Sequence, residues 1–411
     1  MLGVNTPALP ASLRRTNQRT VISLLLRLGC ASRADLAKAA GISQPTAGKI
    51  TSELLEMGLL QELDSAQMDG VSRGRVTPPR LGRPGQLLRL DDSHPRFLAV
   101  ELGVVQTSIS ALPVAIRLHD EWARQIPTPG SARTLLREFE RAAAGLVTDA
   151  FWGVLISVPG IVDETKGKVL FSPNLHWLER VDLVRTVQQI WKLPVVLVQE
   201  IRTLALGHIT AEPGEDFFLV DFGQGVGGAI VLEGQLYPHP MPLSGEVGHT
   251  PIPGNSRRCG CGAIGCLETL VSESGLLQSF AAATGGPPEW SCLVQHLEDH
   301  GLQPWLGDSL EAAAKVICGA LNVLGIHRVV ITGTIASLPE AVTAFLAREI
   351  RKGAMWARFG SVECTNAPRR RSAGLVAAGL DRLVFPAEEN GKSVHPSNRT
   401  SPELSTLVFQ P

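Results

Sequence analysis

The spacing of apolar residues near the start of the chain predicts three short helices. The first ends at Gly29 and carries one apolar stripe, made of Val21, Leu24, Leu25 and Leu28. The second begins after Ser32, with an aspartate three residues later as in a capping box, and ends at Gly41. The third begins after Ser43 and ends at Gly58, and its predicted inward face carries Ile50, Leu54 and Met57.

Three short helices with a tight turn before the third are typical of a helix-turn-helix, although any small helical bundle shows the same pattern. Alternating residues at 59–63 and 86–90 predict the two strands of a wing. The long connection between them contains Gly82-Arg83-Pro84, a rigid turn whose arginine suits a narrow minor groove. Short or polar residues at the start of the third helix suit contacts with bases and phosphates in a major groove, and they are Ser43, Gln44, Thr46, Ala47 and Lys49.

After residue 91, short apolar runs alternate with longer helical patterns, which predicts an α/β architecture. The pattern occurs twice, first with strands at 97–103, 154–158 and 195–198 and helices at 132–150 and 178–192. It returns with strands at 217–222, 228–232 and 328–332 and a helix at 310–324. We therefore expect a head at 13–90, a lobe at 91–210 completed by a helix at 372–385, and a second lobe at 211–371. The Pro-bearing ends, 1–12 and 386–411, are expected to be flexible or disordered.

Composition and charge narrow the class of protein. A chain of 411 residues with 44% hydrophobic and 19% charged residues is typical of a soluble protein with two or three domains. The sequence contains no run of 18 apolar residues and no signal-peptide pattern, so we expect no membrane partner. Residues 1–90 carry 12 Lys/Arg against 6 Asp/Glu, and the remainder carries 26 against 33. A basic head on an acidic body suggests that the head meets phosphate, although a solvated basic surface has the same charge.

A histidine and three of the seven cysteines lie in one glycine-rich stretch, residues 244–268. Three thiolates and one imidazole form a closed tetrahedral set, which predicts a structural Zn²⁺ held by His249, Cys259, Cys261 and Cys266. The alternative is that these cysteines are reduced and unbound. Two carboxylates, Glu246 and Glu268, bracket the set. An odd number of cysteines with three in a cluster favours a reducing cytoplasm over a disulfide framework.

The same stretch resembles the signature of the ROK family, which contains sugar kinases and sugar-responsive repressors. The resemblance rests on GEVGH at 245–249 and CGCGAIGCLE at 259–268, and it extends to the segments 157–169 and 172–177. Residues 33–60 resemble the winged helix-turn-helix of ROK repressors, and Gly82-Arg83-Pro84 resembles their wing. The resemblance implies an actin-like, sugar-kinase-like body of two RNase H-like halves behind that head.

Several positions that a ROK kinase uses differ here. The phosphate loop, DxGGTK in the kinases, reads Glu101-Leu102-Gly103-Val104-Val105-Gln106, and a branched side chain at Val104 hinders close approach of phosphate to the backbone. The catalytic Asp aligns with Glu200, or with Ile201 if the alignment slips by one residue. A carboxylate displaced by about 1 Å catalyses poorly. We therefore expect no catalytic residues and no kinase activity.

The sugar-contacting residues of the family are better kept. Glu246, His249 and Glu268 match them, and Gln199 and Glu200 are weaker candidates. Zinc bound to one ring nitrogen of His249 would aim the other at a ligand hydroxyl, although His249 could also be a structural ligand alone. Because carboxylates accept hydrogen bonds from hydroxyls, this ring of acids suits a neutral polyol.

These observations predict a zinc-containing, sugar-responsive transcriptional regulator of carbohydrate metabolism genes, acting as a repressor in the cytoplasm. Its expected partners are operator DNA, a sugar or sugar derivative as effector, and a second copy of the chain, as a homodimer or a dimer of dimers. Two alternatives remain open. One is an active ATP-dependent sugar kinase with a DNA-binding head, and the other is a metal-sensing regulator that uses the His–Cys₃ set as its switch.

Overall fold

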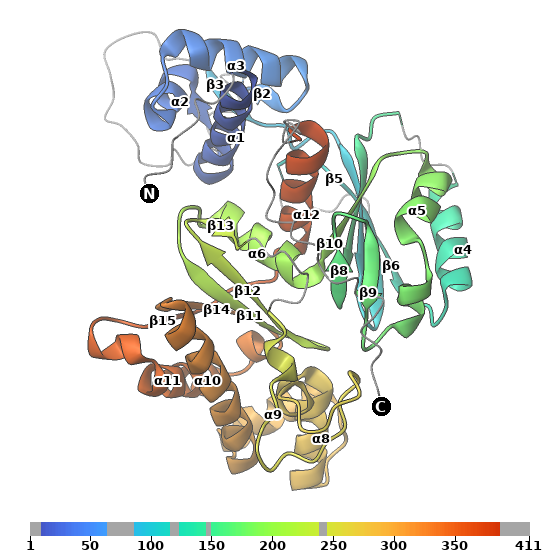
Figure 1. The fold of residues 1–411 in the computed structure, drawn as a ribbon, viewed down its shortest axis with the longest axis vertical. Coiled ribbons are helices and arrows are strands. Elements are labelled where there is room, and N and C mark those ends of the chain that lie inside the picture. The colour runs from blue at the N-terminus through green and yellow to red at the C-terminus, as the bar shows by residue number, and fades with distance from the viewer. Residues whose placement is uncertain (1–9, 64–85, 116–122, 145–148, 238–244, 387–411) are drawn as a thin grey trace, which may run out of the picture.

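A computed structural model describes residues 10–63, 86–115, 123–144, 149–237 and 245–386. Figure 1 shows a small N-terminal head and two lobes, each built on a five-stranded sheet, so the α/β, two-lobed prediction is confirmed. Predictions for residues 1–9, the connection 64–81, Gly82-Arg83-Pro84 and the tail from 387 lie outside the described residues. Within the described ranges, no helix has the length and apolar character needed to cross a membrane.

The head contains the three predicted helices, α1 (Pro10–Leu28), α2 (Arg33–Ala40) and α3 (Gln44–Glu56). Helix α1 begins at Pro10, inside the segment expected to be flexible, because proline fits the first turn of a helix. Ser32 caps α2 and forms a full capping box with Asp35. Ser43 caps α3, and its Oγ accepts a hydrogen bond from the backbone N–H of Thr46 at 3.3 Å.

Two expectations about α3 are wrong. Ala47 was expected to point outward, but it is fully buried. It lies on the same face as Ile50, Thr51 and Leu54, at the i, i+3, i+4 and i+7 spacing of a helix packed on one side. Met57 was expected to point inward, but it follows the end of the helix and is 41% exposed.

The wing forms a three-stranded antiparallel sheet in the order β1-β3-β2. Strands β2 (Leu60–Glu62) and β3 (Leu87–Leu90) are the two predicted strands, and β1 (Ala31–Ser32) is an addition. A two-residue strand has too few residues to show the alternation from which strands are predicted.

The first lobe is a sheet in the order β10-β7-β4-β5-β6. Its parallel part is made of β10 (Val195–Gln199), β7 (Gly153–Val158) and β4 (Phe97–Leu102), and β5 (Gln106–Leu112) and β6 (Ala123–Pro127) add an antiparallel edge. Helices α4 (Ala132–Ala143) and α5 (Leu183–Trp191) cover one face, whereas α6 (Glu200–Ala211) and α12 (Arg371–Gly379) lie on the other (Figure 1).

The helix expected at 178–192 is divided in two. A 3-10 turn, η2 (His176–Arg180), precedes α5, and Asp182 begins α5 by accepting a hydrogen bond from the N–H of Arg185 at 3.0 Å. Apolar periodicity continues across this break, so it does not reveal the new start. A short hairpin, β8 (Ile161–Asp163) and β9 (Lys168–Phe171), follows β7.

The second lobe is a sheet in the order β13-β12-β11-β14-β15. Its strands are β11 (Phe217–Phe222), β12 (Val226–Leu232), β13 (Gln235–Leu236), β14 (Arg328–Gly333) and β15 (Glu363–Asn366). Its helices are α7 (Glu268–Val271), α8 (Glu273–Thr284), α9 (Trp290–His300), α10 (Pro304–Leu324) and α11 (Glu340–Gly353), with short turns η3 (Val247–His249), η4 (Ile335–Ser337) and η5 (Met355–Arg358). After β15 the chain returns to the first lobe as α12, followed by η6 (Leu380–Val384).

Candidate functional site

A cavity of about 340 Å³ lies between the two lobes. It is bordered by the turn after β4, the turn after β7, the start of α6, the β11–β12 turn and the segment that contains η3. All five residues predicted to contact a sugar line this cavity, namely Gln199, Glu200, Glu246, His249 and Glu268. Residues that lie up to 69 positions apart in the sequence therefore line one cavity.

The segment before His249 reaches the cavity because its glycines allow it to pack closely on β12. A Cβ at Gly245, whose φ is +83°, would lie 1.8 Å from the carbonyl oxygen of Gly228. A Cβ at Gly248 would lie 2.2 Å from the carbonyl oxygen of Val226. Neither position accepts a larger residue without movement of the backbone, and this close packing places Glu246 and His249 at the cavity wall.

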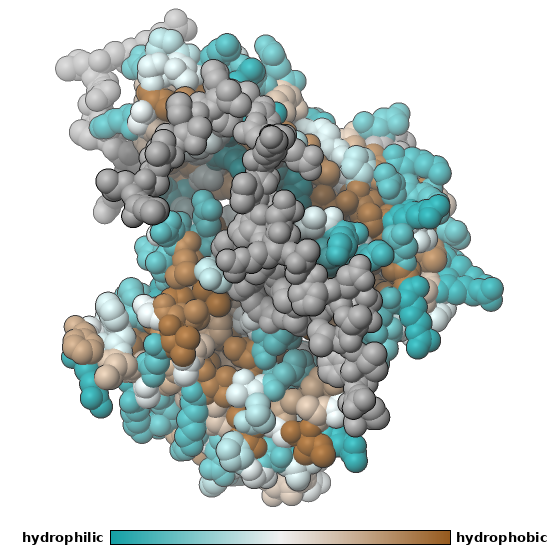
Figure 2. Space-filling view, viewed as in Figure 1, coloured by the Kyte–Doolittle hydropathy of each residue, from teal (hydrophilic) through white to brown (hydrophobic). Residues whose placement is uncertain are grey.

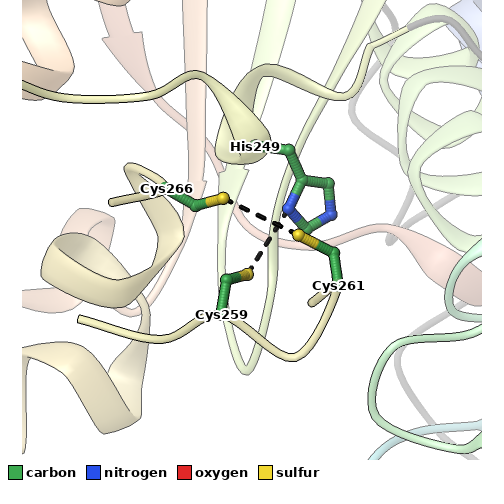
Figure 3. Close-up of side chains that lie close together, drawn as sticks. All are labelled: His249, Cys259, Cys261 and Cys266. Carbon is green, nitrogen blue, oxygen red and sulfur yellow. Dashed lines mark hydrogen bonds between the residues drawn. The ribbon is translucent and has the colours of Figure 1, made fainter. Parts of the chain in front are cut away.

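Four side chains converge beside the cavity and form a group that could hold a metal ion (Figure 3). The Sγ atoms of Cys261 and Cys266 are 3.7 Å apart, and the Sγ of Cys259 is 3.6 Å from Nδ1 of His249. A tetrahedral Zn²⁺, with Zn–S near 2.3 Å and Zn–N near 2.0–2.1 Å, requires separations of about 3.8 Å between sulfurs and about 3.6 Å between sulfur and nitrogen. Two separations in the predicted ligand set therefore match a tetrahedral zinc site, and all four ligand atoms lie within 4.8 Å of one another.

The loop that carries the three cysteines is folded by its own hydrogen bonds. Gly262 and Gly265 both have positive φ, and a Cβ at Gly265 would lie 2.7 Å from the carbonyl oxygen of Asn255. The Asn255 amide donates to the carbonyl oxygen of Cys266 at 3.1 Å, and Arg257 donates to the carbonyl oxygen of Thr269 at 2.7 Å. These bonds bring the sulfurs together before any metal is considered.

The electrostatic setting of the thiols favours a bound cation. Burial raises the pKa of both Cys259 and Cys266, and the nearby Glu268 carboxylate acts in the same direction. Such thiols remain protonated at neutral pH unless a positive charge stabilises the thiolate. A divalent metal would supply that charge, so the chemistry of the donor set agrees with its geometry.

His249 and the two predicted acids connect the cysteine cluster to the cavity. While Nδ1 of His249 faces Cys259, its Nε2 lies 3.7 Å from a carboxylate oxygen of Glu246. Burial and the neighbouring Glu268 raise the pKa of Glu246 to about 7, against a hydrogen bond from Gln199. Glu268 accepts a hydrogen bond from the backbone N–H of Val226 at 2.9 Å, which fixes its carboxylate at the cavity edge.

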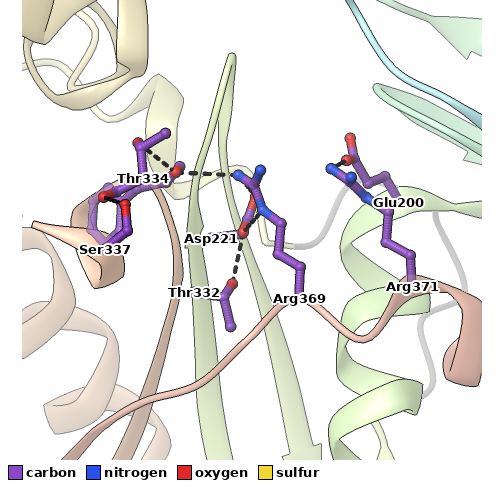
Figure 4. A network of polar contacts seen from close by, with 8 residues as sticks. Glu200, Asp221, Thr332, Thr334, Ser337, Arg369 and Arg371 are labelled. Carbon is purple, nitrogen blue, oxygen red and sulfur yellow. Dashed lines mark hydrogen bonds and ion pairs between the residues drawn. The ribbon is translucent and has the colours of Figure 1, made fainter. Parts of the chain in front are cut away.

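Two arginines that the sequence reasoning missed also line the cavity (Figure 4). Arg369 binds Asp221 in a bidentate manner, with Nε–Oδ1 at 2.7 Å and Nη2–Oδ2 at 2.9 Å. Arg371 forms an ion pair with Glu200. Although burial opposes its charge, the carboxylates of Glu200, Asp221 and Glu101 raise the pKa of Arg371.

These arginines come from the run Arg369-Arg370-Arg371 just before α12, which is the one sequence signal that could have revealed them. Asn174 also lines the cavity and was missed, although it belongs to the segment 172–177 that carries part of the family resemblance.

The two glycine turns that a kinase would use for phosphate donate their N–H groups to acceptors within the chain. The N–H of Gly103 donates to the carbonyl oxygen of Gln106 at 3.1 Å, and that of Gly223 donates to Gly225 at 2.8 Å. The N–H of Val226 is bound to Glu268.

At the start of α3, Gln44 and Lys49 are exposed and Thr46 is partly exposed, as a groove-reading helix requires. Ser43 is exposed, and its Oγ lies 2.7 Å from that of Thr46. Ala47 is buried, so its side chain is not available to contact DNA. Arg83 lies outside the described residues.

Residues 97–380, well over half of the chain, match the ROK family. The chain belongs to the ROK family. It is 30% identical to the xylose repressor of Caldicellulosiruptor bescii over 275 residues, which are 64% of this chain and 66% of that protein. It is 24% identical to the DNA-binding transcriptional dual regulator NagC of Escherichia coli, over 65% of this chain and 64% of NagC. The match thus spans about two thirds of the length of each relative.

One solved structure resembles the head of this chain as well as its body. A ROK family transcriptional regulator, a homologue of the E. coli MLC protein, has a TM-score of 0.66 at 21% identity, over 90% of this chain and 97% of that one. Because this match covers 90% of the chain, it includes residues beyond the ROK match at 97–380. The ROK family glucokinase of Streptomyces griseus, solved with glucose and AMPPNP, has a TM-score of 0.57 at 22% identity over 69% of this ROK chain. The sugar-kinase-like fold of the body is confirmed.

Proposed function

We propose that this ROK protein is a sugar-responsive transcriptional regulator that binds operator DNA and represses genes of carbohydrate metabolism. The observation that carries the proposal is the joining of a winged helix-turn-helix, with Gln44 and Lys49 exposed, to a ROK body whose five candidate sugar contacts line one cavity. Relatives named as a xylose repressor and as the regulator NagC support the same class of function.

The body is proposed to bind sugar without phosphorylating it. Glu200, which aligns with the catalytic base of ROK kinases, is held by Arg371, so its carboxylate is less available to accept a proton from a sugar hydroxyl. Val104 and Val105 stand in the turn that would carry phosphate, and Val105 is 63% exposed. The glucokinase fold supports the rival reading, an active kinase with a DNA-binding head, so ATP turnover must be measured beside DNA binding.

The effector is proposed to be a neutral sugar. Five carboxylates line the cavity, and they belong to Glu200, Asp221, Glu246, Glu268 and Glu273. The two arginines in the wall, Arg369 and Arg371, are already bound to two of these acids. Sugar hydroxyls can donate to the remaining carboxylate oxygens, whereas a phosphate ester would be repelled by them.

Zinc is proposed as a structural cofactor that fixes the wall of this cavity. His249, Cys259, Cys261 and Cys266 would hold it, with Nε2 of His249 left toward Glu246 and the ligand. The metal-sensing alternative requires an ion that exchanges with the supply in the cell. A closed set of four protein ligands instead favours an ion that is held permanently. A homodimer would place two copies of α3 in successive major grooves of a near-palindromic operator.

The deciding experiment measures binding of the purified protein to its own upstream DNA, with and without xylose, glucose, N-acetylglucosamine and their phosphate esters. We expect specific DNA binding whose affinity changes with one neutral sugar and with none of the esters. Sugar-dependent ATP hydrolysis without specific DNA binding would instead establish the kinase.

Replacing Gln44 by alanine is expected to weaken specific DNA binding by about 10- to 100-fold, because a bidentate side chain–base pair contributes about 1–3 kcal/mol. Gln295→Ala, which makes the same change at an exposed position of α9 in the second lobe, is the matched control and should leave affinity unchanged. Fluorescence anisotropy with the specific duplex and a scrambled duplex measures both variants. Equal loss on both duplexes would show that Gln44 does not read sequence.

Replacing Glu246 by alanine is expected to weaken sugar binding by about 10- to 100-fold, since removing one partner of a buried hydrogen bond costs about 1–3 kcal/mol. DNA affinity without sugar should stay at the wild-type value, because Glu246 lies in the interlobe cavity and not in the head. Calorimetry with the identified sugar provides the measurement, and Glu298→Ala on the exposed side of α9 serves as control. A full sugar response in Glu246→Ala would rule out this cavity as the effector site.

A further inference from the structure

The head and the first lobe share one hydrophobic core. Helix α1 contributes Val21, Ile22, Leu24 and Leu25 to a cluster that also contains residues of the first sheet, Phe97, Ala99 and Leu155. The last helix and its extension complete the same cluster with Leu375, Val376, Leu380 and Phe385. Because packed cores have discrete arrangements and do not deform continuously, a shift of α12 must be accompanied by a shift of α1 or by loss of packing.

One end of α12 lies at the cavity between the lobes. Its first residue, Arg371, forms an ion pair with Glu200, the first residue of α6, and both side chains line the cavity. A sugar hydroxyl that donates to Glu200 competes with the Arg371 guanidinium for the same carboxylate oxygens. Ligand binding therefore acts directly on the contact that holds the start of α12 to the start of α6.

The other end of α12 lies against the DNA-binding head (Figure 1). Arg19 of α1 forms an ion pair with Asp381 in η6 at 2.6 Å, and it donates to the carbonyl oxygen of Phe385 at 2.6 Å. Arg15 of α1 donates to the carbonyl oxygen of Pro386 at 3.0 Å. These contacts join the segment that follows α12 to the helix that supports α2 and α3.

A partly buried carboxylate connects the same segment to the sugar side of the first lobe. Glu164, in the β8–β9 hairpin, accepts hydrogen bonds from the backbone N–H of Gln199 at 3.0 Å and from Nε of Arg202 at 3.1 Å, and it pairs with Arg382. Arg382 directly follows the residue that binds Arg19. One side chain thus contacts both the start of α6 and the middle of η6.

A hollow beside these contacts gives α1 room to move. A cavity of about 440 Å³ lies between α1, α6, α12 and the β12–β13 hairpin, and Figure 2 shows the opening between the head and that hairpin. Ile22 and Leu26 of α1 line it on one side, and Leu206 and Leu236 line it on the other. The head is therefore packed on α12 and η6 more closely than on the second lobe.

We propose that α12 carries the effector signal from the cavity to the head, from Arg371 at one end to the Arg19 contacts at the other. Ligand hydroxyls at Glu200 favour an arrangement in which the Arg371 pair is weakened, and the shift of α12 repositions α1 through Asp381 and Phe385. This inference rests on the proposed function, because it requires that sugar changes DNA affinity. The sugar must bind the two arrangements with unequal affinity, and the coupling must be reciprocal.

The test compares Arg19→Ala with Arg14→Ala in the full-length protein. Both remove one arginine from α1, but Arg14 pairs with Glu53 inside the head and Arg19 contacts the body. For each variant, DNA affinity is measured with and without xylose, glucose or N-acetylglucosamine, and sugar affinity is measured with and without DNA. In the wild type and in Arg14→Ala, we expect DNA affinity to differ by about 5–150-fold between the sugar-free and the sugar-bound protein. In Arg19→Ala, we expect this ratio to fall to near one. Sugar affinity without DNA should be equal in all three.

A charge swap tests whether the loss of coupling comes from the missing ion pair or from a general disturbance of α1. Arg19→Asp should lose the coupling, and Arg19→Asp combined with Asp381→Arg should recover part of it, because the ion pair is restored although the Phe385 contact is not. A wild-type affinity ratio in Arg19→Ala, or equal loss in Arg14→Ala, would overturn the inference and leave the proposed function intact. A wild-type protein that binds sugar and DNA without any mutual effect would overturn the proposed function as well.

Discussion

Replacing Cys266 by serine is expected to abolish zinc binding, to lower the stability of the second lobe by more than about 4 kcal/mol, and to eliminate sugar binding. Cys266 is 1% exposed, and its backbone joins the cysteine loop to the residue before Glu268, one of the proposed sugar contacts. Its carbonyl oxygen accepts the Asn255 amide at 3.1 Å. Serine is a poor zinc ligand, and without a metal the remaining ligands are a buried Cys259 thiol, a partly buried Cys261 thiol and a His249 ring that no ion orients.

Zinc content by mass spectrometry of the native protein, together with thermal unfolding, measures this effect. We expect one zinc per wild-type chain and less than a tenth of that in Cys266→Ser. Cys292→Ser is the matched control, because Cys292 is a partly exposed free cysteine of α9 in the same lobe and lies outside the metal cluster. A Cys266→Ser protein that keeps its zinc and its unfolding midpoint would show that the cluster is not a zinc site.

Removing zinc from the wild-type protein with a chelator distinguishes a structural ion from one whose supply the protein senses. A closed His–Cys₃ site should release zinc to a strong chelator only slowly and with loss of sugar binding, because the ion holds the wall that carries His249 and Glu268. A site that exchanges zinc freely, with DNA affinity following the free zinc concentration and sugar binding unchanged, would support the metal-sensing hypothesis. The hydrogen bonds of Asn255 and Arg257 favour the first outcome, since they hold the loop in the shape that the ion requires.

The sequence predicts that His249 and the three cysteines come together, because they are close in the sequence and few other sites combine these residue types. His249 and the three cysteines lie within 18 residues, so the whole ligand set can be read from one short stretch of sequence. The arginine pairs show the opposite case. Arg371 meets Glu200 across 171 positions and Arg369 meets Asp221 across 148, and such partners leave no periodic pattern in either segment.

Small residues and short elements explain two of the errors in the head, those at Ala47 and β1. Ala47 fits both a buried and an exposed helical position, because a methyl group gives little hydrophobic signal, and only the packing of α3 decides between them. The same ambiguity does not affect Ile50 or Leu54, which are buried as predicted. The wing strand β1 escapes prediction since two residues cannot show a period.

Replacing Gly374 by alanine is expected to destabilise the protein by about 3 kcal/mol or more, which is the upper part of the range for overpacking a core. A Cβ at Gly374 would lie 1.8 Å from the carbonyl oxygen of Thr203, in the backbone of α6. On the other side of the crossing, a Cβ at Gly207 would lie 2.0 Å from the carbonyl oxygen of Arg370. Two backbones in contact cannot relax by a change of rotamer, so α6 and α12 must separate.

Gly319→Ala is a control for which the expected change in stability has the opposite sign. Gly319 lies inside α10, and apart from the adjacent backbone of its own helix no atom lies within 4 Å of its Cβ position, so alanine there should stabilise the protein by up to about 1 kcal/mol through helix propensity. Urea unfolding followed by circular dichroism measures both variants. If Gly374→Ala is as stable as the wild type, α6 and α12 can slide apart at little cost. That outcome would show that the close backbone contact at this crossing does not hold the two helices together.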